Sequence, residues 1–144
     1  MPARDFIHDA VRNALIKDGW TITHDPLRLE TGDTAVYVDL GAEQWIGAER
    51  GMEHLAIEIK NYSGRSAVYE MHQAVGQYIT YQAVLHKEKF ERIVYLATTR
   101  SSYQRFFQNE PGLSVMEFYP LNIIIVDEDA EEVEEWIRNS GINS

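Results

Sequence analysis

Apolar residues near the start of the chain recur every three or four positions. One stripe between residues 4 and 18 is formed by Ile7, Ala10, Val11, Ala14 and Leu15. This spacing predicts an amphipathic helix that ends near Gly19. The same spacing predicts the longest helix between Val68 and Leu85, after a break at Gly64 and Ser66.

Runs rich in β-branched and aromatic residues predict the strands of a sheet. A short strand is expected at residues 20–24, where Asp25-Pro26 stops it as a turn. Further strands are expected at residues 35–40 with an extension to 46, at 55–60, at 92–98 and at 122–126. Side chains alternate along a strand, so Ala56, Glu58 and Lys60 share one face of the segment 55–60.

Two further helices complete the expected order of elements. Residues 102–108 predict a short aromatic helix ended by Pro111-Gly112, and residues 129–139 predict an acidic last helix that hides Val133, Trp136 and Ile137. The resulting order, α-β-β-β-α-β-(α)-β-α, predicts an α/β fold with a mixed central sheet flanked by helices. The length of 144 residues suits one domain, so we expect a single domain over residues 1–144.

The composition narrows the classes of function. The chain has no cysteine, which excludes disulfides and thiolate metal sites and agrees with a cytoplasmic protein. No stretch approaches about 18 consecutive apolar residues, so a membrane span is not expected. The first residues also lack the basic stretch and apolar run of an export signal.

The net charge of −10 argues against nucleic-acid binding over the whole protein surface, because phosphate contacts need clustered Lys and Arg. The charge is unevenly distributed: residues 127–144 carry −6, whereas residues 60–105 carry +4. The sequence therefore allows a local positive surface. A protein-binding or self-associating domain would have the same charge pattern.

The pattern that carries chemistry is Glu58-Ile59-Lys60 on an expected strand, preceded by Asp39 at the end of another. Two converging carboxylates suit Mg²⁺ or Mn²⁺, which prefer carboxylate and water oxygens. Lys60 lies about 6.5 to 7 Å along the strand from Glu58, within reach of a water that attacks a phosphodiester. The pattern predicts metal-assisted hydrolysis with Asp39 and Glu58 as ligands, although a solvated strand face would produce the same tripeptide.

The order of elements around these residues resembles the αβββαβ core of the restriction-endonuclease-like PD-(D/E)XK nucleases over roughly residues 4–100. The resemblance places Asp39, Glu58 and Lys60 in the metal-and-base site of that fold. Gln77 and Tyr81 match the Gln-x-x-x-Tyr pattern that some branches carry behind the active site, which implies a catalytic role for Gln77 and leaves the role of Tyr81 open.

Two positions leave the set of metal ligands open. Val38 stands before Asp39 where the motif name expects Pro, and Glu43 shares a face with Asp39 on a regular strand, which makes it the rival first ligand. Asp9 lies on the first helix, where many members of the superfamily carry an acid that faces the metal.

Longer segments make the chain similar to the XisH family, the excision-controlling factors of cyanobacterial DNA elements. The matching segments are ALIKDGWTITHDPL at 14–27, YVDLGAE at 37–43, AIEIK at 56–60 and QAVGQY at 73–78. The resemblance spans most of the chain. It implies a part in controlled DNA rearrangement, beside a site-specific recombinase and a small companion protein called XisI.

Two functions follow from these resemblances as alternatives. One is a DNA-processing factor that hydrolyses phosphodiesters with Mg²⁺ or Mn²⁺; the other is an inactive regulatory module that acts through a partner such as an XisI-like protein. The acidic C-terminal segment motivates the second. Nucleases of this fold often pair two sites across a duplex, so a homodimer is one assembly to test.

Overall fold

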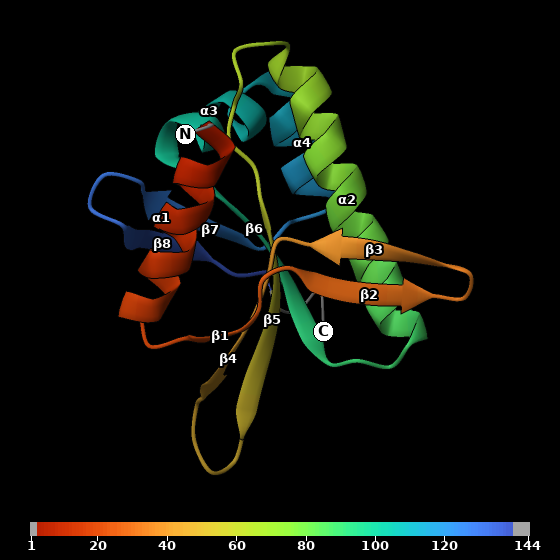
Figure 1. The fold of residues 1–144 in the computed structure, drawn as a ribbon. Helices are drawn as coiled ribbons and strands as arrows, with labels where there is room; N and C mark the ends of the chain where they lie inside the picture. The colour runs from red at the N-terminus through yellow and green to blue at the C-terminus, as the bar shows by residue number, and fades with distance from the viewer. Residues whose placement is uncertain (1–2, 140–144) are drawn as a thin grey trace.

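The computed structural model describes residues 3–139, which form four helices and eight strands (Figure 1). Six strands form one mixed sheet in the order β1-β4-β5-β6-β7-β8, and two form a separate hairpin, β2-β3. The helices are α1 (Ala3–Lys17), α2 (Ala67–Lys87), α3 (Arg100–Phe107) and α4 (Glu110–Phe118). The strands are β1 (Thr21–His24), β2 (Leu27–Thr31), β3 (Thr34–Val38), β4 (Leu40–Trp45), β5 (Met52–Ile59), β6 (Arg92–Thr99), β7 (Ile123–Asp127) and β8 (Glu132–Ile137).

The central sheet is mixed, because its middle strands pair in parallel and the strands toward its edges pair antiparallel. The neighbours β5 and β6 run parallel, as do β6 and β7, whereas β1, β4 and β8 are antiparallel to the strands they pair with. Along the chain, the main sheet and its helices follow the order α1, β1, β4, β5, α2, β6, and then α3, α4, β7 and β8. This order confirms the predicted α/β fold with a mixed sheet flanked by helices. No helix in residues 3–139 is long and apolar enough to cross a membrane.

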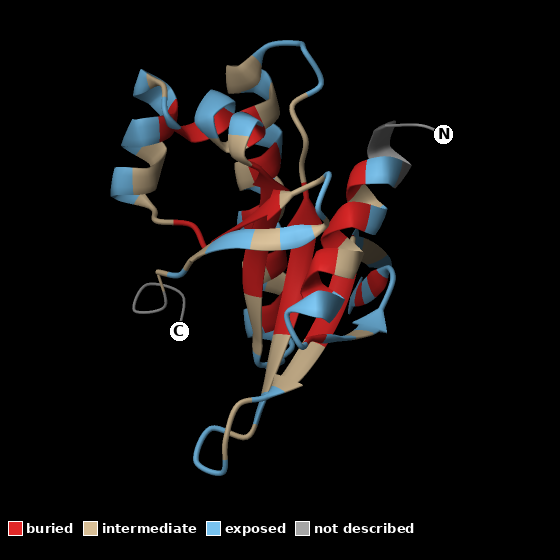
Figure 2. Ribbon diagram, turned by 90° about the vertical axis from the view of Figure 1, so that its left-hand side faces the viewer, coloured by how far each residue is buried: buried red, intermediate tan, exposed pale blue. Residues whose placement is uncertain are grey.

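Each face of the sheet is covered by its own hydrophobic cluster. The helix α1 packs Val11, Ala14 and Leu15 against one face, where Leu55 and Ile57 of β5 meet it. The helix α2, together with α3 and the β2-β3 hairpin, covers the other face, which carries Ala56 of β5. Figure 2 shows the buried residues concentrated in the sheet and on the helix surfaces that face it. The alternation predicted for β5 therefore aims Glu58 at the face that α2 covers.

The single strand predicted from residue 35 to 46 is wrong, because the chain bends at Asp39 and divides there into β3 and β4. Before the bend, β3 pairs with β2, a strand that the sequence analysis missed; Leu27 lies opposite Val38 and Thr31 opposite Thr34. After the bend, β4 joins the main sheet between β1 and β5. The predicted turn around Gly32 is thus the tip of a hairpin that lies outside the main sheet.

The acidic last helix predicted at residues 129–139 is also wrong, because this segment forms β8. Asp127 Oδ1 accepts the backbone N–H groups of Asp129 and Ala130, both at 3.0 Å, and closes a turn that returns the chain beside β7. A strand here satisfies the outer backbone groups of β7, which a helix would leave unpaired. Trp136 is held between Trp20 and Tyr95, with ring centroids 5.7 and 5.3 Å away.

Pro111-Gly112 was expected to end the short aromatic helix, but it begins the next one. The helix α3 ends at Phe107, and the Asn109 side chain then caps α4 by accepting the N–H of Gly112 at 2.9 Å. Proline suits the first turn of a helix, where its missing N–H costs nothing. A Cβ at Gly112 would stand 2.1 Å from the carbonyl oxygen of Phe106, so the close approach of α3 and α4 requires glycine.

Candidate functional site

The two predicted carboxylates meet where β5 ends. Glu58 is the penultimate residue of β5, and Asp39 occupies the bend between β3 and β4. The backbone N–H of Ile59 donates to Asp39 Oδ2 at 2.8 Å, which fixes the Asp39 carboxylate beside the end of β5. The side chain of Glu58 lies on the face under α2 and is only 5% exposed. The bend that divides the predicted strand is therefore what brings Asp39 to Glu58.

Two further side chains contact the Glu58 carboxylate. The Tyr81 hydroxyl lies 3.1 Å from Glu58 Oε1 and 3.0 Å from the carbonyl oxygen of Tyr37, so it can donate its proton to either. Lys60 Nζ lies 4.0 Å from Glu58 Oε2, and its side chain is 25% exposed. Glu58 thus has a buried hydrogen-bond donor on one oxygen and a partly exposed ammonium group near the other.

Burial raises the pKa of Glu58 from 4.5 to about 7, and the negative charge of Asp39 adds to the rise. Lys60 and the Tyr81 hydroxyl act in the opposite direction without cancelling it. Burial, followed by the charge of Glu58, also raises the pKa of Tyr81, so this hydroxyl stays protonated as a donor. Two carboxylates in a poorly hydrated place repel each other, and a bound cation would relieve this repulsion.

Gln77 lies one turn before Tyr81 on α2 and hydrogen-bonds to it. The carbonyl oxygen of the Gln77 side chain is buried and has no hydrogen-bond partner. A buried acceptor without a partner costs about 1–3 kcal/mol, so this atom is suited to accept a hydrogen bond from a ligand or a water molecule. The predicted pair Gln77 and Tyr81 is therefore at the site, with one acceptor free.

Glu43, the rival first ligand, points elsewhere. It lies opposite His54 in the β4-β5 pairing, and its Oε2 is 3.5 Å from His54 Nδ1. His54 precedes Glu58 by four residues along β5, a distance of about 13 Å. The structure therefore places Asp39, and not Glu43, beside Glu58. Asp9 is exposed on α1, the helix that covers the opposite face of the sheet.

The segment that follows Lys60 is held by contacts that the sequence analysis missed. The buried Ser102 of α3 donates its hydroxyl to Asn61 Oδ1 at 2.8 Å and accepts the N–H of Tyr62 at 2.9 Å. Nearer α2, the Glu70 carboxylate accepts from the N–H and hydroxyl of Ser63 at 2.9 and 2.7 Å. No sequence pattern predicts these contacts, because the partners of Ser102 are about forty residues away along the chain.

The chemistry of this donor set fits a hard divalent cation bound by two carboxylates. Among the side chains that the structure describes, in residues 6–139, no group of three or more His, Cys, Asp or Glu could hold a metal. A cation beside Asp39 and Glu58 would complete its ligand shell with water or substrate oxygens, as Mg²⁺ commonly does. The free carbonyl oxygen of Gln77 can accept a hydrogen bond from such a water.

Comparisons with known proteins point to one family. The family model described as XisH protein matches residues 1–134. The crystal structure of an XisH family protein from Nostoc punctiforme has a TM-score of 0.79 and 35% identity, covering 93% of this chain and 100% of that one. The crystal structure of an fdxN element excision controlling factor protein from Anabaena variabilis has a TM-score of 0.82 and 33% identity, covering 94% and 100%. No curated protein matches the chain at a significant level.

Proposed function

The chain belongs to the XisH family, and from this membership and the geometry of its buried carboxylates we propose that it hydrolyses phosphodiester bonds of DNA with Mg²⁺ or Mn²⁺. The family supplies the broader role, that of an excision controlling factor, which is also the name of the Anabaena relative. The hydrolytic activity is the finer part of the proposal and rests on the site.

The single observation that carries the proposal is the placement of Asp39 beside Glu58. The Asp39 carboxylate is anchored by the N–H of Ile59 at 2.8 Å, and the buried Glu58 lies next to it with a pKa of about 7. Such a pair is expensive to keep charged without a cation. The order α1, β1, β4, β5, α2, β6 further supports the resemblance to the PD-(D/E)XK nucleases.

In this proposal, each side chain of the candidate site has its own role in the reaction. Asp39 and Glu58 would hold the metal ion, which when bound would supply charge stabilisation at the scissile phosphate and lower the pKa of a bound water. The ammonium group of Lys60, 4.0 Å from Glu58, orients that water and offsets negative charge on the phosphate. Tyr81 fixes one oxygen of Glu58, and the buried carbonyl of Gln77 accepts a hydrogen bond from a water or the substrate.

Calorimetric titration of Mn²⁺ tests the metal site. We expect the wild type to bind, Glu58→Ala to lose binding, and Glu43→Ala to bind as the wild type does, because Glu43 faces His54. Circular dichroism checks that each variant is folded. Unchanged Mn²⁺ affinity in Glu58→Ala would remove Glu58 from the site.

Cleavage assays on labelled DNA test the chemistry separately. At pH 8.5, above the pKa of Glu58, Lys60→Ala should keep its Mn²⁺ affinity and lose hydrolysis, because its ammonium group acts on the water and the phosphate rather than on the metal. Full cleavage by Lys60→Ala would contradict the assigned role. No cleavage by a wild type that binds Mn²⁺ would leave a metal-binding protein without the proposed activity.

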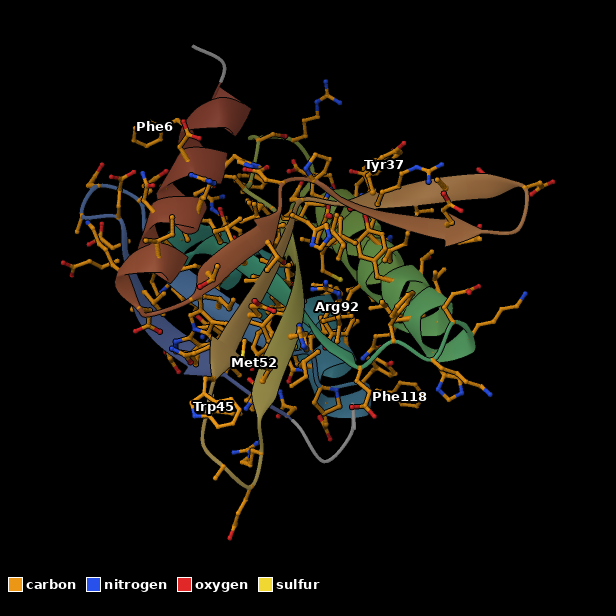
Figure 3. The ribbon with its side chains drawn as sticks, turned by 60° about the horizontal axis from the view of Figure 1, so that its bottom comes forward. Phe6, Tyr37, Trp45, Met52, Arg92 and Phe118 are labelled. Atoms are coloured by element: carbon orange, nitrogen blue, oxygen red, sulfur yellow. The ribbon has the colours of Figure 1, made fainter. Side chains whose placement is uncertain are left out.

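A second function, the regulation of excision through a protein partner, is favoured by apolar side chains at the opposite end of the molecule. Trp45 and Met52 lie opposite each other on β4 and β5 and are 62% and 42% exposed, and Phe118 of α4 is 90% exposed. Figure 3 shows Trp45 and Met52 together on β4 and β5 and Phe118 apart from them, with all three away from Tyr37. The candidate partners are an XisI-like protein, the recombinase and a second copy of this chain. Co-purification that Trp45→Ala abolishes would support this function.

A further inference from the structure

An exposed aromatic ring borders the candidate site on the side of the β2-β3 hairpin. The carbonyl oxygen of Tyr37 lies 3.0 Å from the Tyr81 hydroxyl, which in turn lies 3.1 Å from Glu58 Oε1. Tyr37 also precedes Asp39 by two residues. Its own ring, however, is 55% exposed, so it contributes little to the core and is available to a ligand.

A second exposed ring lies on α2, on the helix face that leads to the site. Tyr69 is 54% exposed, and its hydroxyl accepts from Gln73 Nε2 at 3.4 Å. Gln73 is one turn from Gln77, whose buried side-chain oxygen is free. Residues four apart share a helix face, so Tyr69, Gln73 and Gln77 form one polar and aromatic track about 12 Å long.

The positive charge near the site is small. Lys60 lies in the site and Arg65 in the segment that follows it, while Arg28 beside Tyr37 is paired with Glu30. Arg105 of α3 lies over the Tyr62 ring, 5.0 Å from its centroid, and so borders the same segment, whereas the remaining basic residues of 60–105 are dispersed. Arg92 lies opposite His54, four residues from Glu58 at the far end of β5, and Arg100 is paired with Glu134 and Glu135.

This charge distribution limits how a nucleic acid can be held. A protein that grips a duplex through its backbone uses about 6–10 phosphate contacts, which need as many suitably placed cations. The described basic side chains near the site are fewer: they are Lys60, Arg65, Arg105 and the already paired Arg28. Affinity must therefore come largely from another source, and exposed aromatic rings provide one by stacking on bases.

We propose that this site takes its DNA substrate as an unpaired strand, whose bases stack on Tyr37 and Tyr69 while the backbone crosses Asp39, Glu58 and Lys60. Only unpaired bases present their faces to side chains, because a continuous duplex stacks them against one another. The inference rests on the proposed hydrolysis of DNA. It adds that single-stranded, frayed or flap-containing DNA is the substrate class.

Fluorescence anisotropy of the full chain in Ca²⁺, which takes the same oxygen ligands, measures the preference. We expect a labelled 12-nucleotide single strand to bind at least about ten times more tightly than the duplex of the same sequence. Tyr37→Ala and Tyr69→Ala should each weaken single-strand binding by about five-fold to a hundred-fold, whereas Tyr37→Phe should stay within about two-fold of the wild type. The slope of log affinity against log salt should be about −2, for two or three phosphates.

The matched control is Phe118→Ala, an exposed aromatic residue at the end of α4 and away from Tyr37, which should leave binding unchanged (Figure 3). The inference is overturned if the duplex binds as tightly as the single strand or more tightly, or if neither DNA binds. It is also overturned if Phe118→Ala weakens binding as much as the tyrosine variants do. Efficient duplex cleavage with Mn²⁺ would overturn the substrate class and keep the proposed hydrolysis. A wild type that neither binds Mn²⁺ nor cleaves any DNA would overturn the proposed hydrolysis itself.

Discussion

Replacing Glu58 with glutamine should stabilise the fold in alkaline solution while removing the proposed metal site. Glutamine has nearly the same shape and keeps an oxygen that can accept from the Tyr81 hydroxyl, but it carries no charge. The wild-type carboxyl group is buried beside Asp39, and its pKa rises from 4.5 to about 7. The folded protein therefore holds a proton on Glu58 over a pH range in which the unfolded chain has lost it.

The sign of the pH dependence follows from this difference. Below pH 4.5 both states are protonated at Glu58, and the group contributes no dependence. Between pH 4.5 and about 7 the folded state binds more protons, so the free energy of unfolding of the wild type falls as the pH rises. A shift of this size corresponds to about 3 kcal/mol in total, of which about 2.5 kcal/mol is lost between pH 5 and pH 8.5.

Urea denaturation of the wild type and Glu58→Gln at pH 5 and pH 8.5 measures this quantity. Other titrating groups affect both proteins alike, so the stability difference between variant and wild type should increase by about 2.5 kcal/mol from the lower to the higher pH. A difference that stays constant within about 0.5 kcal/mol would refute the argument, because Glu58 would then ionise in the folded protein as it does in the unfolded one.

Three further predictions use the same contacts. The Mn²⁺ affinity of the wild type should fall about ten-fold per pH unit between pH 7 and pH 5, because Glu58 must lose its proton before it binds the metal. Calorimetry in two buffers of different ionisation enthalpy counts the proton released. An affinity that does not depend on pH would exclude Glu58 as a ligand. Tyr81→Phe should cost about 1–3 kcal/mol at pH 8.5 in urea denaturation, because Glu58 and the carbonyl of Tyr37 lose their donor; an unchanged midpoint would show that neither needs it. Gly112→Ala should lower the thermal midpoint, because the new Cβ would meet the Phe106 carbonyl at 2.1 Å, whereas Gly76→Ala, with no atom within 4 Å, should not.

The parts of the fold that the sequence predicted are those set by local periodicity. The stripe of α1, the long α2 and the alternation of β5 each follow from spacing within one segment, and these elements position Glu58 and Lys60. The failures occur where a distant partner decides the structure. The acidic segment of β8 is a strand because β7 needs a neighbour, and Val133 pairs there with Val126.

The same distinction holds within the candidate site. Glu58-x-Lys60 and Gln77-x-x-x-Tyr81 are visible in the sequence because their members are neighbours on one strand or one helix. The choice between Asp39 and Glu43 depends instead on the bend at Asp39, which the N–H of Ile59 stabilises from twenty residues away. The support of Ser102 for Asn61 and Tyr62 is likewise a contact between elements that only the folded chain brings together.

The β2-β3 hairpin leaves the main sheet after β1 and returns at β4, and the two ends of this excursion meet, since His24 lies opposite Gly41. Because β1 pairs with β4, the order of the central sheet does not depend on the hairpin. Residues 25–38 are therefore an excursion from the main sheet, and their buried Leu27, Leu29 and Val38 join the hydrophobic cluster under α2. A change in the length of the hairpin tip between Thr31 and Thr34 would therefore leave the strand pairing of the central sheet intact.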